Sequence, residues 1–196
     1  MKAEISRVSQ SVVMRRAGNR QWSLKPQDLA VLLKLVMLRG AARVSYAVLA
    51  KQMRLSVFEA HAAVQRLCAA RLVVDLVVDL EGELRPVMVA VRDFVLHGAQ
   101  YSFPAARGEI TIGFPTAYAV PPLKEMVLFA GEMPPVWPHP DGSVRGATLF
   151  PLYEKLPLVA IEDPALYELL ALFDALRVGQ AREREIASKL LAERLQ

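Results

Sequence analysis

The chain has 196 residues, which is enough for one large domain or two small ones. Hydrophobic residues make up 54% of it, which excludes a globally disordered protein. The net charge of +4 is unevenly divided, because residues 1–71 hold 13 Lys and Arg against 3 Asp and Glu, whereas residues 72–196 hold 11 against 17. A basic N-terminal third is typical of a phosphate-binding surface, and the alternative is a solvated basic face without a partner.

Neither the start of the chain nor its apolar stretches indicate a membrane. The opening residues, MKAEIS, lack the apolar core of a signal peptide. The longest apolar stretch, residues 29–38, is interrupted by Lys34 and is too short to span a bilayer. Cys68 is the single cysteine, so no internal disulfide can form, which fits a reducing compartment. We therefore expect a cytoplasmic protein.

Residues 1–22 are predicted to form an N-terminal arm. The stretch from Met14 to Arg20 is basic and rich in turn-forming residues. It is either an arm that reaches DNA phosphates or the minor groove, or a mobile solvated terminus.

Two helices are predicted next. The first begins at Pro26, since proline suits the first helical position, and ends at Gly40. Its apolar stripe comprises Leu29, Leu32, Leu33, Val36 and Met37. Ser45 is expected to cap a second helix over residues 46–53.

A third helix is predicted to start at Ser56, where Glu59 three residues later completes a capping box. Its buried face is marked by residues at helical spacing, Ala60, Val64 and Leu67. The opposite face carries Phe58, His61, Gln65 and Arg66. A short helix, a tight turn and a second helix with a polar outer face is how many proteins read the DNA major groove.

This stretch resembles the winged helix-turn-helix domain of bacterial transcriptional regulators, including the MarR-like ones. The resemblance covers residues 24–92 and rests on Leu49-Ala50, Ser56, Leu67 and Ala70-Arg71-Leu72. Arg54 stands where the family usually has a turn glycine, so it must adopt or avoid a left-handed conformation. The family's glycine near the helix end is also absent. The resemblance implies three helices, a hairpin wing and double-stranded DNA as a partner.

DNA contacts are expected from the third helix and its flanks. Gln65 can offer an amide to adenine, His61 can donate to a guanine acceptor, and Phe58 can touch a thymine methyl group. Arg66, nearer the helix flank, is expected to hold a phosphate. The alternative is that Phe58 and His61 pack beneath the C-terminal segment and never meet DNA. The expected contact set is Arg43, Ser45, Arg54, Ser56, Phe58, His61, Gln65, Arg66 and Arg85.

A β-hairpin is predicted after the third helix. Residues 72–80 alternate with period two, residues 81–83 resemble a turn, and residues 84–91 return as a second strand. A hairpin centred on Gly82 places Asp79 opposite Arg85, which is a favourable cross-strand pair. Because carboxylates at the acidic tip would repel phosphates, this wing either points away from DNA or contacts a protein.

Residues 92–97 are predicted to form a short helix that Gly98 stops. Ten of the 13 prolines fall in residues 98–160, so no helix longer than two turns is expected there, except over residues 123–130. Short strands are expected at residues 108–113 and 145–149. The segment holds too many aromatic residues for a disordered linker, so it is predicted to be ordered and loop-rich. Residues 103–116 and 135–146 resemble segments of uncharacterised bacterial winged-helix proteins, which implies no activity.

Two amphipathic helices are predicted at the C-terminus. Asp163 caps the first, with Pro164 at its first position, and Gly179 ends it. Its apolar face comprises Leu166, Leu169, Leu170 and Phe173. The second helix covers residues 181–195. Such a pair either packs on its own domain or forms a dimer interface, and we favour dimerisation.

Catalytic signals are poor. No phosphate-binding glycine loop and no G-x-S-x-G motif occur. His61, His97 and His139 lie far apart, and Cys68 near His61 would supply only two ligands, too few for a zinc site. Trp137, His139 and Arg145 either line a pocket or pack, and we favour packing. We therefore expect no enzyme, no metal and no organic cofactor.

Together these patterns predict an α+β fold. The expected divisions are an arm (1–22), a winged helix-turn-helix domain (23–98), a Pro- and aromatic-rich segment (99–160) and a C-terminal helical pair (161–196). The predicted function is that of a sequence-specific, homodimeric DNA-binding regulator, and we favour a repressor. The alternative is a winged-helix protein-interaction module or antitoxin-like partner, which the acidic wing and the apolar Val57, Phe58 and Ala62 favour.

Overall fold

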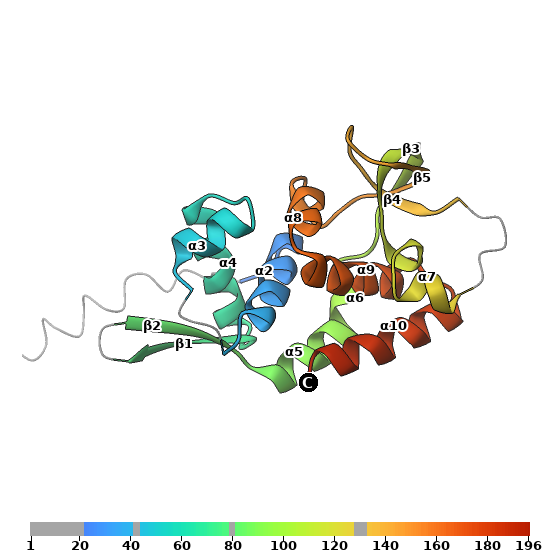
Figure 1. The fold of residues 1–196 in the computed structure, drawn as a ribbon. Helices are drawn as coiled ribbons and strands as arrows, with labels where there is room; N and C mark the ends of the chain where they lie inside the picture. The colour runs from blue at the N-terminus through green and yellow to red at the C-terminus, as the bar shows by residue number, and fades with distance from the viewer. Residues whose placement is uncertain (1–21, 41–43, 79–80, 128–132) are drawn as a thin grey trace, which may run out of the picture.

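A computed structural model describes residues 22–40, 44–78, 81–127 and 133–196, and it has the predicted α+β composition (Figure 1). The N-terminal arm, apart from Trp22, and Arg43 lie outside the described residues. Among the helices in the described part of the chain, none is both long enough and apolar enough to cross a membrane.

The three N-terminal helices lie where the capping signals predicted them: α2 (Pro26–Met37), α3 (Tyr46–Gln52) and α4 (Val57–Ala69). Pro26 opens α2, and the Ser45 hydroxyl accepts the Val48 amide at 3.3 Å at the start of α3. Helix α2 is buried far beyond its predicted stripe, since every residue from Asp28 to Val36 is buried. It lies between α4 on one side and the C-terminal helices on the other (Figure 1).

The hairpin is present, but its predicted register is wrong. Strand β1 (Val73–Val78) pairs antiparallel with β2 (Glu81–Pro86), so that Val77 faces Gly82 and Val74 faces Arg85. Gly82 therefore lies within strand β2 and not in a turn, and residues 79–80 lie outside the described residues. The expected pair between Asp79 and Arg85 does not form, because Arg85 pairs with Val74.

The second half of the predicted return strand is helical. Helix α5 (Met88–Asp93) continues through a π-helical segment, η2 (Phe94–Gly98), into α6 (Ala99–Ser102). Gly98 does not stop this helix, because its backbone keeps right-handed helical angles with φ −111° and ψ −43°. Buried Val91, Val95 and Ala99 hold the helical run against the core.

The described parts of the Pro-rich segment, residues 99–127 and 133–160, are ordered, as the aromatic content predicted. Its strands are β3 (Arg107–Pro115), β4 (Pro135–Pro138) and β5 (Val144–Leu149), and each is hydrogen-bonded to the other two. Strand β3 pairs antiparallel with both others, and β4 pairs parallel with β5. A Cβ atom at Gly113 would lie 2.0 Å from the Trp137 carbonyl oxygen, so only glycine permits this approach of β3 to β4. Its short helices are η3 (Ala117–Ala119), α7 (Leu123–Met126) and α8 (Leu156–Glu162).

The C-terminal pair comprises α9 (Pro164–Val178) and α10 (Ala181–Arg194), as predicted. The Asp163 carboxylate accepts the Leu166 amide at 3.1 Å and caps α9. The apolar face of α9 is buried within the chain, against α2, α6, α8 and α10, so it is not available to a second copy. The leucine stripe of α9 is therefore not the exposed surface that the dimer prediction assumed, and dimerisation itself stays a prediction.

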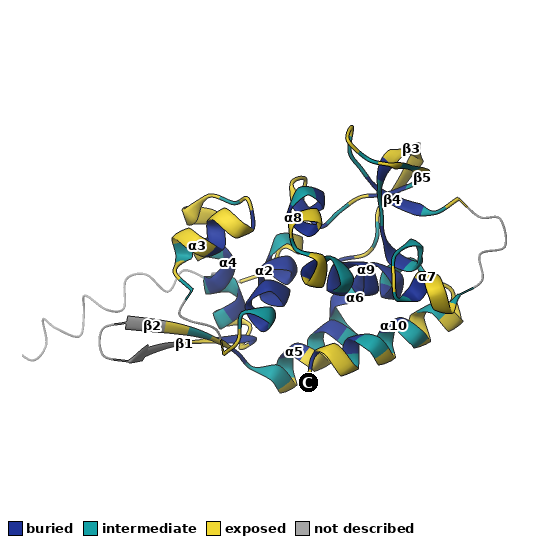
Figure 2. Cartoon of the chain, viewed as in Figure 1, coloured by how far each residue is buried: buried dark blue, intermediate teal, exposed yellow. Residues whose placement is uncertain are grey.

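One hydrophobic cluster joins the three predicted divisions that follow the arm, residues 23–98, 99–160 and 161–196. Figure 2 shows buried residues running from α4 through α2 into α9. Lys34 of α2 also forms an ion pair of 2.7 Å with Asp163 at the start of α9. The C-terminal helices thus complete the core that α2 begins.

A buried carboxylate fixes the β-strand segment onto α9. Asp174 accepts hydrogen bonds of 2.7 Å from the Thr116 hydroxyl and the Trp137 indole, and it forms an ion pair with Arg177. The Tyr167 hydroxyl donates to the Pro115 carbonyl. Burying a polar group costs free energy unless the group is paired. This cluster therefore favours one position of the sheet on α9, the one in which these hydrogen bonds form.

Candidate functional site

The most exposed functional candidates lie on the α3–α4 unit, defined here as residues 45–70. Its turn is tight, since the Leu55 amide donates to the Ala50 carbonyl at 2.9 Å. Arg54 adopts the left-handed conformation with φ +51°, and Arg71 at the end of α4 does so with φ +59°. Arginine thus occupies both sites where the resembled family favours glycine.

The two faces of α4 differ sharply. Ala60, Ala63, Val64 and Leu67 are fully buried on the inner face. On the outer face the Phe58 side chain is 81% exposed, which is unusual for an aromatic residue. The interpretation in which Phe58 and His61 pack beneath the C-terminal segment is wrong, since both are exposed.

His61 and Gln65 are held near their positions by Tyr46 of α3. The Tyr46 and His61 rings meet edge to face with centroids 5.0 Å apart. The Tyr46 hydroxyl lies 3.4 Å from the Asp75 carboxylate of β1, and it also contacts Gln65. Burial, followed by the charge of Asp75, raises the pKa of Tyr46, so its hydroxyl keeps its proton. One side chain therefore connects α3, α4 and the hairpin.

The N-terminus of α4 is sealed by the predicted capping box. The Ser56 hydroxyl accepts the Glu59 amide at 3.2 Å, and the Glu59 carboxylate accepts the Ser56 amide at 2.8 Å. The Ser56 hydroxyl also donates to the Glu59 carboxylate at 2.7 Å, and this hydrogen bond, followed by the one from the Ser56 amide, lowers the pKa of Glu59, with smaller contributions from Lys155 and Lys25. Ser56 is thus a structural cap, and two lysines from distant parts of the sequence lie near this helix end.

Arg66 has a partner inside the protein. Its Nε and Nη2 atoms each lie 2.7 Å from an oxygen of the Asp28 carboxylate on α2. The Asp28 side chain is fully buried, and only 11% of the Arg66 side chain is exposed. The expected phosphate contact of Arg66 is therefore replaced by a core ion pair.

The C-terminal segment contacts the turn of the α3–α4 unit, which the sequence did not predict. Arg54 forms an ion pair with Glu162 at the end of α8. The Tyr153 hydroxyl donates to the Met53 carbonyl at 2.8 Å, and burial raises the pKa of this tyrosine. These partners lie about a hundred residues away along the chain, so no local pattern reveals them.

The hairpin strands contribute one cation to the expected contact set. Arg85 is exposed and forms an ion pair of 3.1 Å with Glu83 on the same strand.

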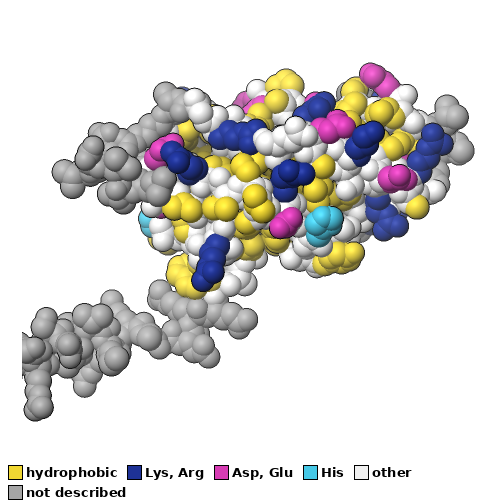
Figure 3. Space-filling view, turned by 90° about the horizontal axis from the view of Figure 1, so that it is seen from below, with side chains coloured by type: hydrophobic (Ala, Val, Ile, Leu, Met, Phe, Trp, Pro, Cys, Tyr) yellow, Lys and Arg dark blue, Asp and Glu magenta, His cyan; other side chains and the backbone are white. Residues whose placement is uncertain are grey.

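Figure 3 views the molecule from the side opposite α3 and β3, and on this face Lys and Arg side chains alternate with Asp and Glu. Much of the basic excess of residues 1–71 lies in residues 1–21 and at Arg43, outside the described residues.

The remaining candidates have structural surroundings. Trp137 is 1% exposed and donates to Asp174, which confirms the packing role favoured for it. The His139 ring stacks on Phe114 with centroids 5.1 Å apart, and Arg145 is exposed. In the part of the chain that the structure describes, no three His, Cys, Asp or Glu side chains gather in a way that could hold a metal ion.

Comparison with known proteins adds no assignment. The chain matches no protein-family model, no curated protein and no solved structure.

Proposed function

We propose that this chain is a DNA-binding transcriptional regulator, in which α3, its turn and α4 form a helix-turn-helix. The β1–β2 hairpin follows α4 in the position of a wing. The observation that carries the proposal is the contrast on α4. Its inner face is fully buried, whereas its outer face presents Phe58, His61 and Gln65. An exposed helix face with polar and aromatic side chains fits the major groove.

In this proposal, base reading belongs to His61 and Gln65, and Phe58 contacts a thymine methyl group. Tyr46 restrains both polar side chains, which reduces the ordering cost of a base contact. Phosphate contacts are assigned to exposed cations that form no ion pair among the described residues, such as Lys51. Arg54 and Arg66 are excluded because Glu162 and Asp28 already neutralise them.

A homodimer remains part of the proposal, since one recognition helix reads only a short site. Its interface does not use the apolar face of α9. A regulator of this kind gains specificity by placing two α4 helices on half-sites one DNA turn apart, at about 34–36 Å.

The experiment is selection of bound sequences from random duplex DNA, followed by titration of the selected site at several salt concentrations. We expect affinity to fall as salt rises, because each neutralised phosphate releases a counterion. His61→Ala or Gln65→Ala should cost about 1–3 kcal/mol on the selected site and little on random DNA. Lys51→Ala should weaken both equally and lower the salt slope by about one.

The matched control is Lys189→Ala, which removes an exposed lysine from α10 and should leave both affinities unchanged. Absence of any salt-dependent DNA binding by the full chain would refute the proposal. A selected site that binds the His61 and Gln65 variants as tightly as the parent protein would refute the assigned base contacts.

The second candidate function is protein interaction through the same α3–α4 unit. The observation in its favour is the exposure of three apolar side chains, Val48, Val57 and Phe58, which are 46%, 53% and 81% exposed. Exposed aromatic residues often anchor protein interfaces. Failure of DNA selection, together with loss of a protein partner on Phe58→Ala, would support this function over the first.

A further inference from the structure

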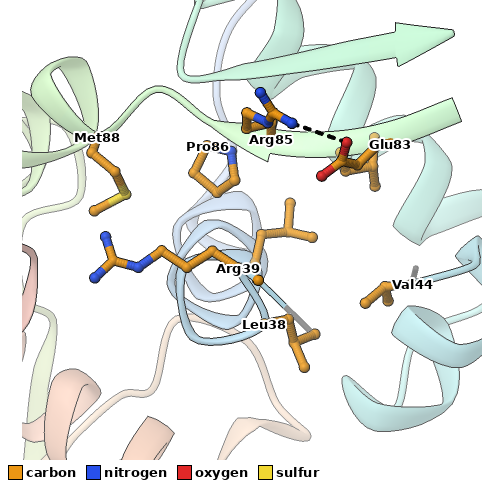
Figure 4. A pocket seen from close by; sticks show the side chains of 10 residues that line it. Leu38, Arg39, Val44, Glu83, Arg85, Pro86 and Met88 are labelled. Carbon is orange, nitrogen blue, oxygen red and sulfur yellow. Dashed lines mark hydrogen bonds and ion pairs between the residues drawn. The ribbon is translucent and has the colours of Figure 1, made fainter. Parts of the chain in front are cut away.

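A pocket lies between the end of α2 and the foot of the β1–β2 hairpin. It has a volume of about 440 Å³, which is within the range of small-molecule sites. Its apolar lining comes from three elements and the link after α2, and comprises Leu35, Leu38, Val44, Leu84, Pro86 and Met88. Figure 4 shows Leu38, Val44, Pro86 and Met88 from this lining together with the charged side chains of Arg39, Glu83 and Arg85.

The charges at the rim do not balance. Arg85 and Glu83 form an ion pair of 3.1 Å on one side. Arg39 extends along the other side toward Met88, away from Glu83 (Figure 4). In the described part of the chain Arg39 has no carboxylate partner, so the pocket presents one uncompensated guanidinium beside an apolar surface.

We infer that this pocket binds a small organic monocarboxylate with an apolar body. The carboxylate would accept hydrogen bonds from the Arg39 guanidinium, whose planar donors suit that group. The apolar body would cover Leu38, Val44 and Pro86 and remove their surface from water. The net positive charge of two arginines and one glutamate complements a single negative charge.

Such a ligand would bridge α2 and β2. Helix α2 is fixed in the core, whereas the hairpin is a two-stranded sheet whose strands have no further pairing partner among the described residues. Binding should therefore restrain the hairpin relative to α2, and backbone amide exchange in residues 83–88 should slow. This inference stands apart from the proposed DNA binding, because it requires only the free protein and the ligand.

The test uses octanoate as the probe with the full chain, measured by titration calorimetry and by amide exchange. We expect saturable binding of octanoate and at least tenfold weaker binding of octan-1-ol, which has the same chain without the charge. Octylamine, with the opposite charge, should bind least. Arg39→Gln should weaken octanoate at least tenfold and leave octan-1-ol unchanged, whereas Arg92→Gln, on an exposed arginine outside the pocket, should change neither.

Three outcomes would overturn the inference: no saturable octanoate binding, equal binding of octylamine, or unchanged octanoate affinity in the Arg39→Gln protein. Arg39 is exposed at the end of α2, so its replacement should leave the fold intact. Slowed exchange confined to another region would show that the probe binds elsewhere and would equally overturn the site.

Discussion

Arg66 and Asp28 join α4 to α2 through two parallel contacts of 2.7 Å. The same carboxylate accepts the Lys25 backbone amide at 2.8 Å and so also caps α2. Because the contact has two points, it fixes the rotation of α4 on α2. It therefore determines that Phe58, His61 and Gln65, rather than their neighbours, face outward.

Replacing Arg66 with Met should destabilise the protein strongly, because the buried Asp28 charge would lose its partner. The expected loss is about 3–5 kcal/mol in the free energy of unfolding, measured by urea denaturation. Adding Asp28→Asn to the variant should recover part of this loss. Arg92→Met, on an exposed arginine, is the control, and a loss below about 1 kcal/mol for Arg66→Met would contradict the core ion pair.

Substitutions at Arg54 test whether the backbone of the α3–α4 turn is strained, since the φ angle of this residue is +51°. Both Arg54→Gly and Arg54→Ala remove the ion pair with Glu162, but only glycine adopts this conformation without strain. The Gly variant should therefore be more stable than the Ala variant by about 1–2 kcal/mol. Thermal melting of the two proteins measures the difference. Equal stabilities would mean that the turn relaxes when the arginine is removed.

Asp174→Asn tests the buried cluster beneath the sheet. Asparagine retains an acceptor for Thr116 and Trp137, but it leaves the Arg177 guanidinium buried without a counter-charge. The expected loss is about 3–5 kcal/mol in the free energy of unfolding. Asp141→Asn, at a side chain that is 84% exposed, should change stability negligibly. Comparable losses in the two variants would contradict the cluster's role.

The raised pKa of Tyr167 predicts that the free energy of unfolding falls at alkaline pH. Burial, followed by the charge of Asp174, raises its pKa from 10.0 to about 12. Its contribution is fully present below pH 10, because the tyrosine is then protonated in both states. Above pH 10 the unfolded chain loses this proton first, so stability falls until about pH 12. Tyr167→Phe should reduce this fall in urea titrations between pH 9 and 12, whereas Tyr101→Phe, on an exposed side chain, should not. A fall of unchanged size in Tyr167→Phe would assign it to other groups, such as the half-buried Tyr153.

Local signals predicted the elements of the fold well. Capping residues such as Ser45, Ser56 and Asp163 marked helix starts because their hydrogen bonds reach only three residues along the chain. The predicted hairpin register is wrong because it places the turn at Gly82, whereas the strands pair with Gly82 opposite Val77. Turn position depends on how a hairpin packs, which a glycine alone does not reveal.

The parts of the site that depend on distant contacts could not be predicted. Phe58, His61 and Gln65 were assigned correctly to the outer face of α4, since helical periodicity fixes a face. The prediction that Arg66 holds a phosphate overlooks its core partner, because Asp28 lies 38 residues earlier in the chain. The contacts of Arg54 and Met53 with the C-terminal segment were missed for the same reason.

The burial of α2 on all sides also has a consequence for synthesis of the chain. Lys34 and its partner Asp163 are separated by 129 residues, so α2 emerges from the ribosome long before α9 exists. Until then its leucine and valine side chains lack part of their cover, and exposed apolar surface in a nascent chain favours aggregation. Expression should therefore be sensitive to translation pauses between α2 and α9, and release of the nascent chain before residue 178 should yield insoluble product.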